Sequence, residues 1–145
     1  MSLSGAYDPA NIFAKILRGE APCVRVHDDA EALVMMDIFP QAPGHCLVVP
    51  RAVEARNLLD LPPERVGGLF ETVQRTAQAV SRALKPDGVI VTQFNGAPAG
   101  QTVFHLHVHV IPRFGDAPLQ RHAAGSPADL EVLREQAARI KAAWE

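Results

Sequence analysis

The sequence predicts an α+β fold in which helices pack on a single antiparallel sheet of about five strands. Two stretches, residues 62–84 and 126–144, carry apolar side chains at helical spacing. Short apolar runs bounded by Pro, Gly and Asp occur elsewhere, a pattern typical of strands. A length of 145 residues is that of one domain, so we expect a single domain over residues 1–145, with a tail and helix over 115–145.

The first expected element is a short amphipathic helix near the N-terminus. Asp8 supplies an N-cap, Pro9 a favoured first-turn residue, and Gly19 an end. The apolar residues between them lie at helical spacing: Ile12, Phe13, Ile16 and Leu17. Their common face must cover another part of the protein.

Strands are expected next. Two β-like runs, residues 24–27 and 32–37, are separated by turn-forming aspartates and predict an antiparallel hairpin. The following segment, residues 39–44, is too rich in Pro and Gly for regular structure. It leads into a strand that ends at Pro50, which places His45 at the start of that strand.

The second half is expected to contain a long helix, two strands and a C-terminal helix. Apolar residues over 62–84 predict the long helix, and a proline soon after ends it. Residues 89–94 and 103–111 predict strands that pair antiparallel across a Gly- and Pro-containing loop. Residues 126–129 are a helix-start signature, and the apolar positions that follow continue to Trp144.

Composition and charge exclude several classes of protein. A formal net charge of −2, with Lys and Arg scattered along the chain, argues against polymeric nucleic acid as a partner. No apolar stretch approaches the roughly 20 residues that span a bilayer, and the first residues do not resemble a signal peptide. We therefore expect no membrane association and a cytoplasmic location. Cys23 and Cys46 form no CxxC pair, so we expect reduced thiols. We also expect no cofactor.

A row of histidines is the most informative feature of the sequence. His105, His107 and His109 alternate along the strand expected over 103–111, so their imidazoles should project from one face. The residues on the other face are apolar and can pack on a helix: Leu106, Val108 and Val110. Three groups that titrate near neutrality cost stability without a packing benefit, so we interpret the row as functional.

Metal binding and phosphate chemistry are the alternatives for this row. Histidines two apart on a strand are separated by roughly 6.6 Å and the outer pair by about 13 Å, so three cannot easily converge on one zinc ion. A zinc hydrolase that uses His105, His107 and His45 remains the weaker alternative. The loop before the row favours phosphate, because it offers N–H, amide and hydroxyl donors. These donors come from Gly96, Gly100, Gln101 and Thr102.

The segment 100–111 resembles the signature of the histidine-triad (HIT) nucleotide-binding family, His-φ-His-φ-His-φ-φ with φ apolar. Residues 12–22 and 37–50 are similar to other blocks of that family, in the same order. The resemblance covers roughly residues 10–114 and implies a HIT-like fold for this core.

The resemblance implies a nucleotide hydrolase that acts at the α-phosphorus through a nucleotidyl-histidine. The front half is closer to the Hint-like branch, which cleaves adenosine phosphoramidates. Residues 100–103 and 112–113 are closer to the fragile-histidine-triad (Fhit-like) branch, which cleaves dinucleoside polyphosphates. His109 favours hydrolysis, because relatives that transfer nucleotides usually carry Gln there. A nucleotide-binding regulatory or scaffold protein with vestigial activity is the alternative.

The resemblance also assigns roles to individual residues. His107 matches the nucleophile, and His105 and His109 match flanking residues that orient it and bind phosphate oxygens. His45 matches a supporting histidine, and Asp37 matches a carboxylate that binds ribose hydroxyls. Further positions match phosphate-side donors, Gln101 and Thr102, and a nucleotide contact, Asn95. The base pocket corresponds to Ile12, Phe13, Ile16, Met35 and Ile38.

Metals and assembly are the last points on which the resemblance bears. Some bacterial members bind structural zinc through cysteines near the first helix, where this chain has Asn11 and Ala14. We therefore expect no bound metal. Family members commonly form homodimers, so we expect a homodimer. The expected ligand is a small nucleotide substrate.

Overall fold

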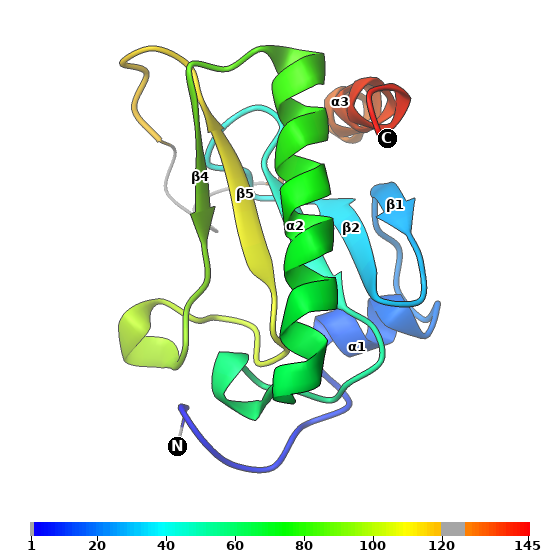
Figure 1. The fold of residues 1–145 in the computed structure, drawn as a ribbon, viewed down its shortest axis with the longest axis vertical. Helices are drawn as coiled ribbons and strands as arrows, with labels where there is room; N and C mark the ends of the chain where they lie inside the picture. The colour runs from blue at the N-terminus through cyan, green and yellow to red at the C-terminus, as the bar shows by residue number, and fades with distance from the viewer. Residues whose placement is uncertain (1, 120–126) are drawn as a thin grey trace.

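A computed structural model describes residues 2–119 and 127–145, and its centre is a five-stranded sheet. The strands follow the order β1-β2-β3-β5-β4, and every neighbouring pair is antiparallel (Figure 1). Their bounds are β1 Arg25–Asp28, β2 Ala32–Met36, β3 Cys46–Pro50, β4 Gly88–Thr92 and β5 Val108–Arg113. The expected α+β class, the hairpin of β1 and β2, and the antiparallel pairing of β4 with β5 are confirmed.

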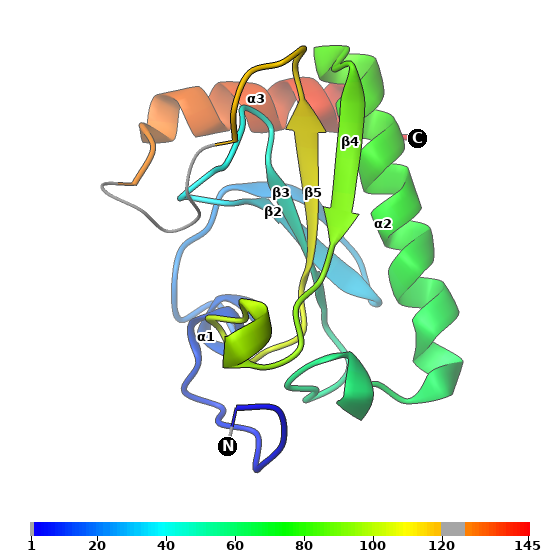
Figure 2. The ribbon, with the colours of Figure 1, turned by 90° about the vertical axis from the view of Figure 1, so that its left-hand side faces the viewer.

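Helices cover the two faces of the sheet unequally. The long helices are α2, Pro63–Leu84, and α3, Leu130–Ala142. Helix α2 contacts β2, β3 and β5, while α3 contacts β1, β2 and α2, so both lie on one face. The short helix α1, Ile12–Leu17, lies on the opposite side of the sheet from α2 (Figure 2). The other face is therefore only partly covered.

Alternate residues of the central strands divide the core into two clusters. On the α2 side, Val34, Val48 and Val110 belong to one apolar cluster, together with residues of both long helices. On the α1 side, a smaller cluster contains Phe13, Ile16, Leu33, Met35, Leu47 and Val49. Both faces of β2 and β3 are thus buried, which explains why these strands are apolar without alternation.

The helix ends agree in part with expectation. Helix α1 is capped by Asn11, whose Oδ1 accepts from the Ala14 N–H at 2.9 Å, so the expected Asp8 cap is wrong. Asp8 instead accepts from the N–H of Ala10 in the turn before the helix. Gly19, at φ 79°, follows the last turn and confirms the expected end.

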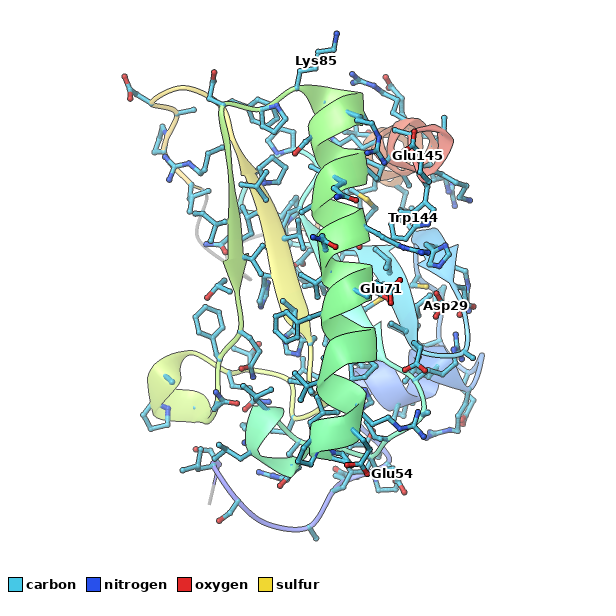
Figure 3. All side chains as sticks on the ribbon, in the orientation of Figure 1. Asp29, Glu54, Glu71, Lys85, Trp144 and Glu145 are labelled. Atoms are coloured by element: carbon cyan, nitrogen blue, oxygen red, sulfur yellow. The ribbon has the colours of Figure 1, made fainter. Side chains whose placement is uncertain are left out.

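The C-terminal helix is shorter than the apolar pattern predicts. Asp129 caps α3, as the helix-start signature indicates, although Ser126 lies outside the described residues. The helix ends at Ala142, and Trp144 beyond it stacks on His27 with a centroid separation of 4.2 Å. Figure 3 shows Trp144 beside β1, where this contact ties the chain end to the edge of the sheet.

The largest departure concerns the strand expected over 103–111. Strand β5 begins only at Val108, so His109 is the single member of the histidine row within it. Before this point the Leu106 N–H donates to the Ala55 carbonyl at 2.8 Å rather than to a neighbouring strand. The prediction of one continuous histidine strand is wrong. The side chain of Leu106 still packs in the cluster on the α2 side.

Among the described residues, no helix is both long enough and apolar enough to cross a bilayer.

Candidate active site

A cavity of about 420 Å³ lies on the α1 side of the sheet. Its lining includes every apolar residue expected in the base pocket: Ile12, Phe13, Ile16, Met35 and Ile38. Polar residues expected at the site also line it: Asp37, Thr102, His107 and His109. Four other expected residues do not line it: His45, Asn95, Gln101 and His105. The cavity is therefore lined by apolar side chains and by polar groups that include two histidines.

His107 is held in one tautomer. Its Nδ1 lies 2.7 Å from the carbonyl oxygen of His105, and a carbonyl can only accept, so the hydrogen is on Nδ1. Nε2 of the neutral ring then carries a lone pair. The ring is 7% exposed and meets Phe13 edge to face, with centroids 4.8 Å apart. His107 lines the cavity, and a neutral imidazole in this tautomer is suited to nucleophilic attack.

A second chain of hydrogen bonds fixes His45 and His109. The Gln41 N–H donates to Nδ1 of His45 at 3.0 Å, so the hydrogen of a neutral His45 is on Nε2. That Nε2 lies 2.9 Å from Nδ1 of His109 and donates to it. The hydrogen of a neutral His109 must therefore be on its Nε2. His45 thus sets the tautomer of a histidine that lines the cavity.

Asp37 follows β2 and is buried, with 3% of its surface exposed. Its Oδ1 accepts from the Phe39 N–H at 2.9 Å, and its Oδ2 lies 3.4 Å from Nε2 of His45. The turn that brings His45 to this position passes through Gly44, at φ 87°, where a side chain would be strained and would collide with Leu84. Backbone geometry therefore places the carboxylate and this histidine together.

His105 faces away from the cavity. Its Nε2 donates to the Pro50 carbonyl at 3.0 Å, and its Nδ1 lies 2.6 Å from the Tyr7 hydroxyl. Burial lowers the pKa of the His105 imidazole, so the neutral ring accepts from Tyr7. Sequence reasoning missed Tyr7, because 98 residues separate it from His105 and no local pattern marks the contact.

Gln101 and Asn95 brace loops in this structure. The Gln101 Oε1 accepts from the Gly96 N–H, and its Nε2 donates to the carbonyls of Arg56 and Val103. The Asn95 Oδ1 accepts from the Leu58 N–H at 2.9 Å. The amide of Gln101 is therefore engaged by the backbone of three residues, which shapes the loop before the histidines.

Cys23 and Cys46 differ in their surroundings. Burial raises the pKa of the Cys46 thiol to about 12, so this thiol stays protonated and is a poor nucleophile. Cys23 lines the cavity and is half-buried, a position that the sequence did not indicate.

The donor set does not suit a metal ion. His105 and His107 are committed to carbonyl acceptors through Nε2 and Nδ1, so the zinc trio considered from the sequence is not assembled. Asp37, His45 and His109 do bring ligand atoms within 4.8 Å of one another. However, a neutral His45 that bound metal through Nε2 would need its hydrogen on Nδ1, which already faces the Gln41 N–H.

A larger cavity of about 810 Å³ lies between α3 and residues 22–25. None of the described residues that line it is a histidine, and its cationic side chains are those of Arg25, Arg134 and Lys141. Arg25 and Arg134 form ion pairs with Asp28 and Glu131. The chemical groups described above are therefore concentrated at the smaller cavity.

Comparisons with known proteins relate the chain to one family. The sequence profile of the HIT domain matches residues 18–116. The chain is 34% identical over 118 residues to adenylylsulfatase HINT3 of Arabidopsis thaliana, a match that covers 77% of this chain and 59% of that protein. It is 32% identical to adenosine 5'-monophosphoramidase hnt1 of Schizosaccharomyces pombe, covering 86% of this chain and 93% of the relative.

A solved structure is similar over almost the whole chain. It is the crystal structure of a Hit-like protein from Bartonella henselae, described as involved in cell-cycle regulation and as containing an unknown ligand. The TM-score is 0.90 at 46% identity, and the alignment covers 96% of this chain and 99% of the other.

Proposed function

The chain belongs to the histidine-triad (HIT) family, and we propose that it hydrolyses nucleotides at the α-phosphorus. The substrates are adenosine or other purine nucleoside phosphoramidates, or dinucleoside polyphosphates, and the product is a nucleoside monophosphate. The reaction passes through a nucleotidyl intermediate on His107. We also propose that the protein acts as a cytoplasmic homodimer.

The observation that carries this proposal is the tautomer of His107. Its hydrogen is directed at the His105 carbonyl through Nδ1, so Nε2 presents a lone pair without loss of a proton. An imidazole in this state is a nucleophile at neutral pH. The cavity around it supports binding of an apolar base beside a charged group, because its lining combines apolar side chains with polar groups.

The reaction has two steps. In the first, Nε2 of His107 forms a bond to the α-phosphorus, and the bond to the leaving amine or phosphate breaks with its electron pair. The leaving group takes up a proton from solvent water. In the second step, a water oxygen bonds to phosphorus, the phosphorus bond to Nε2 breaks, and a proton from water is released.

His109 and Thr102 serve the phosphoryl oxygens in this proposal. Both line the cavity, and the hydrogen of neutral His109 is on Nε2 because His45 donates to its Nδ1. Fixed donors that meet charge as it develops are usually the largest catalytic contribution. Asp37 is assigned to the ribose hydroxyls, and its burial beside His45 supports a positioned acceptor.

The named relatives favour an adenylyl group as the part that is recognised. One is an adenylylsulfatase and another an adenosine 5'-monophosphoramidase, and their substrates share adenosine 5'-phosphate with different leaving groups. We therefore place adenosine phosphoramidate first and diadenosine polyphosphate second.

The test is to incubate the wild-type protein and His107→Ala with each of these two substrates. We expect AMP release by the wild type and, after rapid acid quenching, a protein adduct of AMP mass. Neither signal should appear with His107→Ala. Negligible turnover by both proteins, with nucleotide binding retained, would support a regulatory or scaffold role instead.

A further inference from the structure

The segment that carries the nucleophile is not supported by the sheet. Strand β5 starts at Val108, so residues 103–107 have no partner strand in the described part of the chain. The carbonyl of His105, which accepts from Nδ1 of His107 at 2.7 Å, belongs to this irregular stretch. Its position must therefore be set by other contacts.

The ring of His105 supplies such contacts on both of its nitrogens. Nε2 donates to the carbonyl of Pro50, the last residue of β3, at 3.0 Å. Nδ1 accepts from the Tyr7 hydroxyl at 2.6 Å, and the ring is only 1% exposed. A buried ring that is held at both ends restrains its own backbone, including the carbonyl that orients His107.

Tyr7 lies in the N-terminal segment, residues 2–7, which is itself held in place by hydrogen bonds. The Arg56 guanidinium donates to the carbonyls of Ser2 and Ala6, each at 3.0 Å. The Asn57 Nδ2 donates to the Leu3 carbonyl at 2.8 Å. These contacts fix a segment that contains no helix or strand and bring its tyrosine to His105.

We propose that Tyr7 is a positioning residue for the nucleophile: its hydroxyl fixes His105, and the His105 carbonyl fixes the tautomer and direction of His107. The inference rests on the proposed function of His107. It adds a role for the N-terminal segment, which would otherwise have no part in the chemistry.

The protonation states of Tyr7 and His105 agree with a hydrogen bond in which Tyr7 donates and His105 accepts. Burial raises the pKa of the Tyr7 hydroxyl, so it keeps its proton and donates. Burial also lowers the pKa of His105, which keeps Nδ1 as an acceptor. The hydrogen bond from the Tyr7 hydroxyl to Nδ1 of His105 is therefore present at neutral pH.

The test compares Tyr7→Phe with the wild type and with Ser2→Ala. Ser2→Ala is a matched control, because it removes a hydroxyl from the same segment, one that accepts from the Ala97 N–H. For Tyr7→Phe we expect kcat to fall about 10- to 100-fold, because the nucleophile is less well oriented. KM should stay within about twofold, because no cavity contact is removed. Ser2→Ala should have the kcat of the wild type.

Long-range proton–nitrogen NMR of the histidine rings is the second measurement and does not depend on turnover. In the wild type, we expect the hydrogen of His105 on Nε2 and that of His107 on Nδ1. In Tyr7→Phe, the Nδ1 resonance of His105 should shift downfield, and His107 should show a mixture of tautomers.

The outcomes separate this inference from the proposed function. An unchanged kcat and an unchanged His107 spectrum in a folded Tyr7→Phe would overturn the positioning role while leaving the hydrolase intact. Equal losses of kcat in Tyr7→Phe and Ser2→Ala would also overturn it, because they would point to general loosening of the segment. A wild type without turnover but with the expected NMR change would instead contradict the proposed function alone.

Discussion

The two faces of the sheet are built from the same strands but differ in how they are covered. On one face, α2 and α3 seal an apolar cluster that includes Leu69, Val110 and Ile140. On the other, the six-residue helix α1 covers part of the surface and leaves the cavity that His107 lines. Sealing favours stability, whereas incomplete covering leaves room for a ligand.

The histidine segment shows how closely the two faces are coupled. Leu106 and Val108 are buried on the α2 side, while His107 and His109, which alternate with them, line the cavity. Stability and chemistry are thus separated by side-chain direction and not by sequence position. Substitutions on the two faces should therefore have opposite consequences.

The largest effect is expected for His107→Ala on the cavity face. Removing the nucleophile should lower kcat/KM by at least about 10³-fold. The free energy of unfolding should change by only about 1 kcal/mol, mainly from the hydrogen bond to the His105 carbonyl. Steady-state kinetics and urea denaturation measure the two quantities. A large loss of stability would show that the faces are not separable at this residue.

Leu69→Ala on α2 should give the converse result. Leu69 is 2% exposed in the sealed cluster, so its truncation should cost about 2–5 kcal/mol of unfolding free energy. The kcat of the protein that remains folded should be close to that of the wild type. Urea denaturation, with activity measured well below the transition, tests this. A matching fall in kcat would mean that core packing on this face reaches the cavity.

Asp37→Asn tests whether this buried carboxylate binds the nucleotide. The amide keeps the size and one oxygen but removes the charge, so we expect AMP affinity to fall about tenfold, as measured by calorimetry. Asp29→Asn is the matched control. Its carboxylate also accepts backbone N–H groups in a turn, from Glu31 and Ala32, but lies at the β1–β2 turn. If the wild type, Asp37→Asn and Asp29→Asn bind AMP with equal affinity, Asp37 is an ordinary turn residue.

The smallest effect is a pH dependence that arises from His105. Burial holds its folded pKa below the ordinary value, so the unfolded chain binds the proton at higher pH than the folded protein. The contribution to stability is therefore complete above about pH 6.5 and is lost as pH falls toward the folded pKa, with a slope of at most about 1.4 kcal/mol per pH unit. Denaturation at about pH 7.5 and about pH 5 measures it. If the unfolding free energy of His105→Asn depends on pH as steeply as that of the wild type, other groups cause the effect.

Much of the fold could be predicted because its signals are local. The helical spacing of residues 62–84, the paired β-like runs before Met36 and the prolines at element ends each indicate structure over a few residues. The apolar lining of the cavity and the place of Asp37 and His45 came from the family resemblance. Local pattern and family motif together therefore gave the architecture and the cavity.

The remaining features depend on long-range contacts. Alternation over 103–111 looks the same whether or not a partner strand is present, and the Leu106 N–H binds the Ala55 carbonyl instead. Asp8 and Asn11 are both good caps, and only the path of the chain decides between them. Tyr7 and the loop-bracing role of Gln101 depend on partners 98 and 45 residues away.

The hydrogen bonds that link Gln41, His45 and His109 begin at the peptide N–H of Gln41. A peptide N–H does not titrate near neutral pH. An anion beside His109 would thus meet a hydrogen from an uncharged ring, and its recognition would persist in mildly alkaline solution. The described residues around the cavity include no lysine or arginine. Attraction of a phosphate would accordingly depend on oriented dipoles rather than on net positive charge.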